Sequence, residues 1–413
     1  MNPFELKAKP LDKCLVSLKA LASKPYNKNT ADPYTKIRII LMNGTEYESV
    51  WMGHQFSRHC MNNELRREIA LIRRIEQQQQ KRIASLKPKN ESILEHTIGY
   101  EMLAVDLTVS LAKRVRDETV KKALDFALLE DFDHLYRYSD LLEGERGIKA
   151  EKLIGKYDEI MPGRPTIAEH RYPFDDIKPF IKPDADLFTK LCTNIITAAE
   201  QQTMNYYMNL GAFYDSDAGR KLYSEIAMIE EQHVSQYGSL KDPSLSWLEC
   251  CVMHEYTECY LYWSSYETES DEEVKALWEE LFEQEVAHLH KACELLEKYE
   301  KKSAAELIPG GAFPKALKLE ADKEYVRKVL ESVRLTADRD DYVSADKLTE
   351  DSDFAKYQRV VTDDKANVPS HRVIKAYIAK NGRDYRYEDE PHPVEELRDR
   401  SKDNTSIGRV QAD

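Results

Sequence analysis

Residues 254–263 read HEYTECYLYW, and this stretch places Glu255 and Glu258 among residues typical of the buried face of a helix. An unpaired carboxylate is one of the most expensive groups to bury in a protein core. The two glutamates therefore predict that a positive charge balances them, and the rest of the chain indicates where that charge comes from.

A histidine with an acid three residues before it occurs four times in the chain. The pairs are Asp131/His134, Glu230/His233, Glu285/His288 and Asp389/His392. Counting back 30 residues from the acid of each pair leads in turn to Glu101, Glu200, Glu255 and Arg359. The fourth pair lies among prolines without helical periodicity and serves as a control on the search. Because residues i and i+3 share one face of a helix, the other three cases predict three helical hairpins.

Each hairpin would carry a glutamate on its first helix and an acid with a histidine on its second, at the same height. Two such hairpins place six ligands inside a four-helix bundle, as in ferritin-like di-iron and di-manganese proteins. Carboxylates with one imidazole per ion suit iron or manganese better than an ion that prefers thiolates. We therefore expect two Fe ions, or two Mn ions, per bundle.

These motifs resemble those of the ferritin-like superfamily and, within it, rubrerythrin. The segments that carry the resemblance are IEEQH (229–233), HEYTECY (254–260) and EQEVAH (283–288), within about residues 186–300. The resemblance implies that Glu255 bridges the two ions. It also implies that Glu258 is a ligand that changes coordination with redox state, which makes Glu258 the catalytic candidate. Rubrerythrins usually add a rubredoxin module with two CxxC pairs, which this chain lacks, so we expect an external electron donor protein.

The second and third hairpins supply the main predicted metal site. Its ligands are Glu200, Glu230, His233, Glu255, Glu258, Glu285 and His288. The first hairpin predicts a second site at Glu101, Asp131 and His134, where Glu130 and Asp133 compete with Asp131 as the partner of the histidine. We interpret the nearby tyrosines as packing residues; they are Tyr206, Tyr207, Tyr237, Tyr260 and Tyr262.

We expect the second and third hairpins to pair, because their motifs are the most alike. The connection between them, GSLKDPSL at 238–245, reaches at most about 26 Å, which is barely enough for a crossover along the bundle. The alternative is that the long proline-rich link at 143–185 lets the first hairpin pair with the second. The third would then pair with its copy in another subunit.

The predicted fold class is mainly α: a ferritin-like four-helix bundle with an additional helical hairpin, a small N-terminal β-hairpin and a charged C-terminal tail. The β-hairpin is predicted at residues 36–52, where Asn43 and Gly44 stand between two β-prone runs. Helices are predicted at 64–86, 92–115, 117–142, 186–214, 216–237, 243–268, 271–300 and 319–334. The predicted parts are 1–62 with the β-hairpin, 63–145 with the partial metal motif, a linker at 146–185, the bundle at 186–300 and an extension at 301–413.

Composition narrows the class of protein further. A net charge of −14 argues against a nucleic-acid surface. The first residues, MNPFELKAKPLDK, lack the apolar block of a signal peptide, and no apolar run is long enough to cross a membrane. Seven cysteines without a CxxC pair indicate reduced thiols. We expect a cytoplasmic protein and a homo-oligomer, a dimer in the first place, because the first hairpin alone supplies only half a site.

The function predicted from the sequence is that of a non-haem di-iron or di-manganese carboxylate protein. It would react with dioxygen or hydrogen peroxide as an oxidase or peroxidase. The alternatives are a ferroxidase that handles iron, an oxygenase of an organic substrate, and a ferritin-like structural or interaction protein with a vestigial metal site.

Overall fold

The computed structural model describes residues 1–155, 159–387, 395 and 398, and it is mainly helical. The chain forms two compact units, each made of three separate segments. The first unit comprises Met1–Glu91, Lys182–Gln202 and Asp242–Leu319; the second comprises Ser92–Ile181, Thr203–Lys241 and Glu320–Asp413. The fourth acid and histidine pair, Asp389 and His392, lies outside the described residues.

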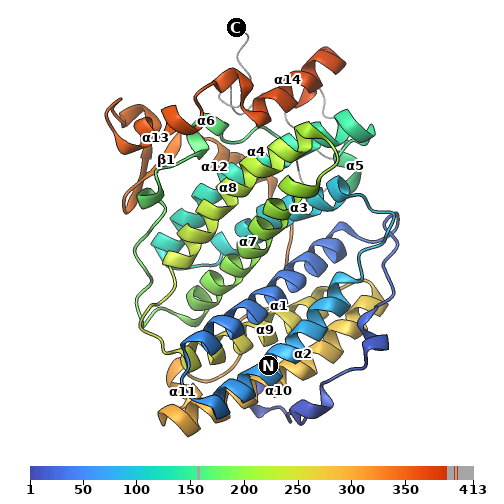
Figure 1. The fold of residues 1–413 in the computed structure, drawn as a ribbon, viewed down its shortest axis with the longest axis vertical. Helices are drawn as coiled ribbons and strands as arrows, with labels where there is room; N and C mark the ends of the chain where they lie inside the picture. Colours follow the sequence, from blue (N-terminus) through green and yellow to red (C-terminus); the bar gives the residue numbers. More distant parts are fainter. Residues whose placement is uncertain (156–158, 388–394, 396–397, 399–413) are drawn as a thin grey trace. The chain divides into compact units, whose positions relative to one another are not determined.

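Four long helices form the core of the first unit: α1 (Pro33–His59), α2 (Asn63–Ala84), α9 (Trp247–Thr268) and α10 (Glu272–Glu300). Helix α1 packs against α2 and α9, and α10 packs against α9 and α2 (Figure 1). The unit also contains the short elements η1 (Pro3–Glu5), η2 (Leu11–Lys13), η3 (Leu18–Leu21) and α11 (Ala304–Leu307), and the first part of α7 (Leu187–Phe213). Two hairpins, α1–α2 and α9–α10, therefore build one helical bundle.

The ends of these helices are set by side chains that cap free backbone N–H groups. Ser246 and Glu249 form a reciprocal capping box at the start of α9. Asp271 accepts hydrogen bonds from two backbone N–H groups at the start of α10, and Asn62 does the same for α2. Asp32 caps α1, and Pro33 takes the first helical position, where no N–H is needed.

The β-hairpin predicted at residues 36–52 is wrong, because these residues belong to helix α1. The run Ile37–Met42 is almost entirely buried, so it shows no polar face and looks like a buried strand in the sequence. Gly44 does not form a turn. It lets α1 approach Gln202, whose side chain donates a hydrogen bond to the backbone oxygen of Ile40 at 2.9 Å. Tertiary packing thus overrides the local turn signal.

The second unit is built around α3 (Ile93–Ala112), α4 (Glu118–Arg146), the remainder of α7 and α8 (Asp217–Ser239). Helix α4 packs against α3, α8 and α14, and α14 also packs against α8. The other elements are α5 (Glu151–Ile154), α6 (Thr166–Glu169), η4 (Pro173–Asp175), α12 (Lys323–Leu330), β1 (Leu335–Asp338), β2 (Asp341–Ser344), η5 (Ala345–Lys347), α13 (Asp353–Val361), η6 (Lys365–Asn367), α14 (Pro369–Asn381) and η7 (Tyr385–Tyr387). Strands β1 and β2 pair antiparallel, with Leu335 opposite Ser344.

Two predicted boundaries need correction. The single bundle predicted at 186–300 is divided, because its residues up to Gln202 and from Asp242 belong to the first unit and those between belong to the second. The extension predicted at 301–413 also contributes folded structure to the second unit. Arg386, for example, is fully buried and donates a hydrogen bond to Asp140 of α4 at 2.5 Å.

A search of the described helices for a long, apolar segment that could cross a membrane found none.

The helical conformation of α1 can be tested at Gly44. Alanine stabilises a helix interior by about 1 kcal/mol relative to glycine. At Gly144 in α4, an added Cβ meets no atom within 4 Å, so Gly144→Ala should raise the melting temperature. At Gly44 the Cβ would lie 2.7 Å from Nε2 and 3.2 Å from Cβ of Gln202, so Gly44→Ala should lower it. Thermal unfolding followed by circular dichroism measures both. Equal stabilisation by the two substitutions would contradict the packing of α1.

Candidate metal centres

The core of the first unit contains a cluster of five carboxylates and one imidazole. The residues are Glu46, Glu76, Glu255, Glu258, Glu285 and His288, and each is at most 2% exposed. Ligand atoms of Glu76, Glu255, Glu285 and His288 lie within 4.8 Å of one another, as do ligand atoms of Glu46, Glu76 and Glu258. Glu76 belongs to both groups. The cluster can therefore accommodate two neighbouring cations that share one carboxylate.

His288 lies among the acids of the first group. Its Nδ1 is 2.6 Å from Oε1 of Glu76, 3.2 Å from Oε2 of Glu285 and 3.8 Å from Oε2 of Glu255. Burial lowers the pKa of His288, but the charges of Glu76 and Glu285 overcome this effect and hold the pKa well above its ordinary value. One imidazole cannot balance this many acids.

Glu258 is the least supported acid of the cluster. It is fully buried, and neither carboxylate oxygen has a hydrogen-bond partner among the described residues. Nε2 of His254 lies 3.4 Å from its Oε1. Burial raises the pKa of Glu258 well above its ordinary value, and the charges of Glu76 and Glu285 raise it further. A cation bound in the cluster would supply the missing partner.

Other side chains orient the acids from outside. Tyr262 donates a hydrogen bond to Glu46, and Nε2 of Gln79 donates one to Oε1 of Glu285 at 2.5 Å. In the second unit, Tyr207 likewise donates a hydrogen bond to Glu101. Tyr262 and Tyr207, both interpreted as packing residues, therefore contact acids of the candidate sites. Tyr260 instead donates to the backbone oxygen of Lys315 at 2.8 Å.

The sequence interpretation missed Glu46 and Glu76. The two residues are 30 positions apart, and Gln79 follows Glu76 by three, so α1–α2 repeats the pattern of the other hairpins with glutamine in place of histidine. A search that required histidine could not find it. A search for two glutamates 30 residues apart, without the requirement for a histidine three residues later, would have returned this hairpin together with other matches.

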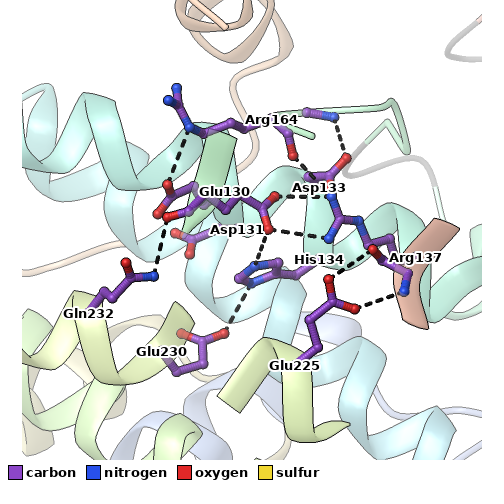
Figure 2. Close-up of polar contacts among 12 residues, drawn as sticks. Glu130, Asp131, Asp133, His134, Arg137, Arg164, Glu225, Glu230 and Gln232 are labelled. Atoms are coloured by element: carbon purple, nitrogen blue, oxygen red, sulfur yellow. Dashed lines mark hydrogen bonds and ion pairs between the residues drawn. The ribbon is translucent and has the colours of Figure 1, made fainter. Parts of the chain in front are cut away.

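A second cluster lies inside the second unit, where the first and second predicted hairpins meet. Ligand atoms of Glu101, His134 and Glu230 lie within 4.8 Å of one another. Nδ1 of His134 is 3.1 Å from Oε1 of Glu230, as the dashed line in Figure 2 marks. Nδ1 of His233 is 3.2 Å from Oε2 of Glu230 and 3.4 Å from Asp131. All five residues are buried.

The structure distinguishes the acids that compete for His134. Asp131 lies with the cluster, whereas Glu130 binds the far side of His233, with 2.7 Å between Oε2 of Glu130 and Nε2 of the ring. Asp133 forms an ion pair with Arg137 instead. Burial would raise the pKa of Glu130, but Arg171, His233 and Arg164 lower it to about 2. Glu130 is therefore an ionised acid outside the cluster that pairs with the cluster histidine His233.

The seven ligands predicted for one site are distributed over both units. Glu255, Glu258, Glu285 and His288 come together in the first unit, with Glu46 and Glu76 as their partners. Glu230 and His233 belong to the second unit, with Asp131 and His134. Glu200 is a buried residue of α7, in the segment of that helix that belongs to the first unit. The first hairpin meets the second, as in the alternative pairing, but the third hairpin packs against α1–α2 of the same chain, not against the second copy that the alternative expected.

No family model, curated protein or solved structure matches this chain. The chemistry of the clusters therefore carries the functional interpretation.

The carboxylate of Glu258 allows a test of the metal-free protein. Because the pKa of Glu258 is raised on folding, its contribution to stability is present below the ordinary value and is lost as the pH rises through the raised value. Glu258→Gln removes this buried charge. At pH 7 and without metal, it should stabilise the fold by about 1–3 kcal/mol and weaken the loss of stability with rising pH.

Thermal unfolding of the metal-free variant over a range of pH measures this effect. Glu279→Gln is the matched control, because Glu279 is an exposed residue of the same bundle, on α10. A Glu258→Gln protein that melts like the control at every pH would mean that the carboxylate is not under electrostatic strain.

Proposed function

We propose that this chain is a ferritin-like di-metal carboxylate protein whose first unit binds two iron or manganese ions and reacts with hydrogen peroxide or dioxygen. The observation that supports the proposal most directly is the pair of buried ligand groups that share Glu76. They come from four helices of one unit and resemble the ligand arrangement of ferritin-like di-metal bundles.

The donor atoms favour these ions over others. Carboxylate oxygens with one imidazole suit iron and manganese, whereas a zinc site commonly uses thiolates or several histidines. The described cysteines nearest in sequence, Cys251 and Cys259, are buried and belong to no ligand group. Glu255, Glu285 and His288 would hold one ion, Glu46 and Glu258 the other, and Glu76 both.

The surrounding residues fit a redox role for such a pair. When bound, two ions of this kind can each supply an electron to the O–O bond of an oxidant. Glu258 is restrained by no hydrogen bond from a described residue, so its side chain can adjust when the charge of the site changes. Glu255 and Glu285 are instead close to His288, and Glu285 also accepts a hydrogen bond from Gln79.

A histidine that can relay protons lies beside the site. His254 lies between two acids, with Nδ1 3.2 Å from Oε2 of Glu48 and Nε2 3.4 Å from Oε1 of Glu258. His254 is 7% exposed and Glu48 is 8% exposed, whereas Glu258 is fully buried. An imidazole can accept a proton on one nitrogen and release one from the other. His254 can therefore carry protons between the solvent side and Glu258.

A metal that only stabilises the fold is the competing explanation, and Glu258 separates the two. For a redox site, Glu258→Gln should keep near-normal metal content but slow reoxidation of the reduced protein by hydrogen peroxide at least about tenfold, equivalent to about 1.4 kcal/mol. The physical reason is that a neutral amide cannot compensate the added charge of the oxidised site. Stopped-flow absorbance measures the rate.

Two further variants complete this test. His288→Ala should lower the amount of iron bound, because it removes the imidazole of the cluster. Glu279→Gln should behave like the unmodified protein. If Glu258→Gln and Glu279→Gln reoxidise at the same rate, the enzymatic interpretation loses its main support.

A further inference from the structure

Histidines of the two clusters differ in the partner of Nε2, the ring nitrogen on the side away from the cluster acids. Nε2 of His233 lies 2.7 Å from Glu130, while its Nδ1 faces Glu230 and Asp131. His288 also turns Nδ1 toward its cluster, but its Nε2 has no hydrogen-bond partner among the described residues. His233 of the second unit thus has a hydrogen-bond partner behind its ring, whereas His288 of the first unit has none among the described residues.

Glu130 is itself held firmly. Nη1 of Arg171 donates a hydrogen bond to its Oε1 at 2.5 Å, and Nε of Arg164 lies 3.4 Å from the same oxygen; a dashed line joins Glu130 and Arg164 in Figure 2. An ionised Glu130 accepts a hydrogen bond from the Nε2–H group of His233, which leaves the Nδ1 lone pair directed at the carboxylates of Glu230 and Asp131. A divalent cation bound between these groups would replace this repulsion with ligation.

His134 also has an acid on the side away from the cluster, but this acid lies beyond hydrogen-bond distance. Its Nδ1 faces Glu230, and its Nε2 lies 3.9 Å from Oε2 of Glu169. Arg137 fixes Glu169 with two hydrogen bonds of 3.2 Å. Both histidines of the second cluster therefore have a buried acid behind them, and each acid is paired with a buried arginine.

Among the described residues, His288 is the one histidine in the ligand groups of the first cluster, since His254 lies beside Glu258 but belongs to neither group. Gln79 occupies the position three residues after Glu76 that His134 occupies after Asp131. It is buried and donates a hydrogen bond to Glu285, so it cannot offer an imidazole nitrogen. The two clusters differ both in histidine number and in histidine support.

We propose that the second unit holds a metal centre of its own, formed by Glu101, Asp131, His134, Glu230 and His233, and that it binds divalent metal more tightly than the first. Outer carboxylates that orient ligand histidines typically contribute about 10–100-fold to metal affinity. Glu130 is the positioning residue of this centre. The proposal does not depend on the reactivity of the first unit.

Manganese(II) titration of the metal-free full-length protein, with free manganese measured by electron paramagnetic resonance, tests the proposal. We expect two classes of site. His288→Ala should remove only the weaker class. Glu130→Gln should weaken the tighter class about 10–100-fold and leave the weaker class unchanged.

Asp140→Asn is the matched control for Glu130→Gln. Asp140 is also a buried acid of α4 paired with a buried arginine, Arg386, but it belongs to neither cluster. This variant should titrate like the unmodified protein. If Glu130→Gln keeps its helical circular dichroism and titrates the same way, the proposal is overturned. A single class of site that disappears in His288→Ala would overturn it as well.

Gln79→His provides a test that does not require removal of a buried charge. It adds the missing imidazole to the first cluster and should strengthen the weaker class, bringing the two classes closer. If Glu130→Gln fails to fold, an unchanged weaker class in Gln79→His contradicts the proposal. Peroxide reactivity tests the first unit separately, so the failure of one proposal leaves the other standing.

Discussion

The burial of carboxylates is the constraint on which the cores of both units depend. In the first unit, five buried glutamates converge, and His288 is the one histidine among the described residues that belongs to their ligand groups. Such groups are expensive to bury unless they are protonated, paired or bound to a cation. Burial and repulsion from neighbouring acids raise the pKa values of Glu255 and Glu258, so both groups favour the protonated form when no cation is bound. A cation bound among these acids would remove this cost.

The helical hairpin provides the geometry that brings these acids together. Two antiparallel helices joined by a short turn place residues 30 apart at equal height, each about 20 Å from the turn at 1.5 Å per residue. The pair Glu46 and Glu76 and the pair Glu255 and Glu285 follow this rule in the first unit. Because the rule depends only on helix length and turn length, it works for hairpins of otherwise different sequence, and it tolerates Gln79 where another hairpin has histidine.

In the second unit, the charges of buried carboxylates are balanced in a different way. Glu130 and Glu169 are buried beside Arg171 and Arg137, so their charges are paired without a metal ion. A buried ion pair adds little stability by itself, since desolvation offsets the attraction between the charges. Its benefit here is orientation, because Glu130 selects which nitrogen of His233 faces the cluster. The second cluster thus has a charge-paired acid hydrogen-bonded to His233, whereas Nε2 of His288 in the first has no hydrogen-bond partner among the described residues.

The sequence by itself determined the mainly helical class, the hairpins with histidine and the cluster acids Glu255 and Glu258, because helical period and the spacing of acids are local properties. Only the tertiary structure decided that α1 is a helix and which hairpins share a core. An apolar run such as Ile37–Met42 indicates that its residues are buried, but it does not indicate which segment packs against them. Glu46 and Glu76 became recognisable as site residues once α1–α2 packed against α9–α10, since pairing depends on complementary surfaces that no single segment encodes.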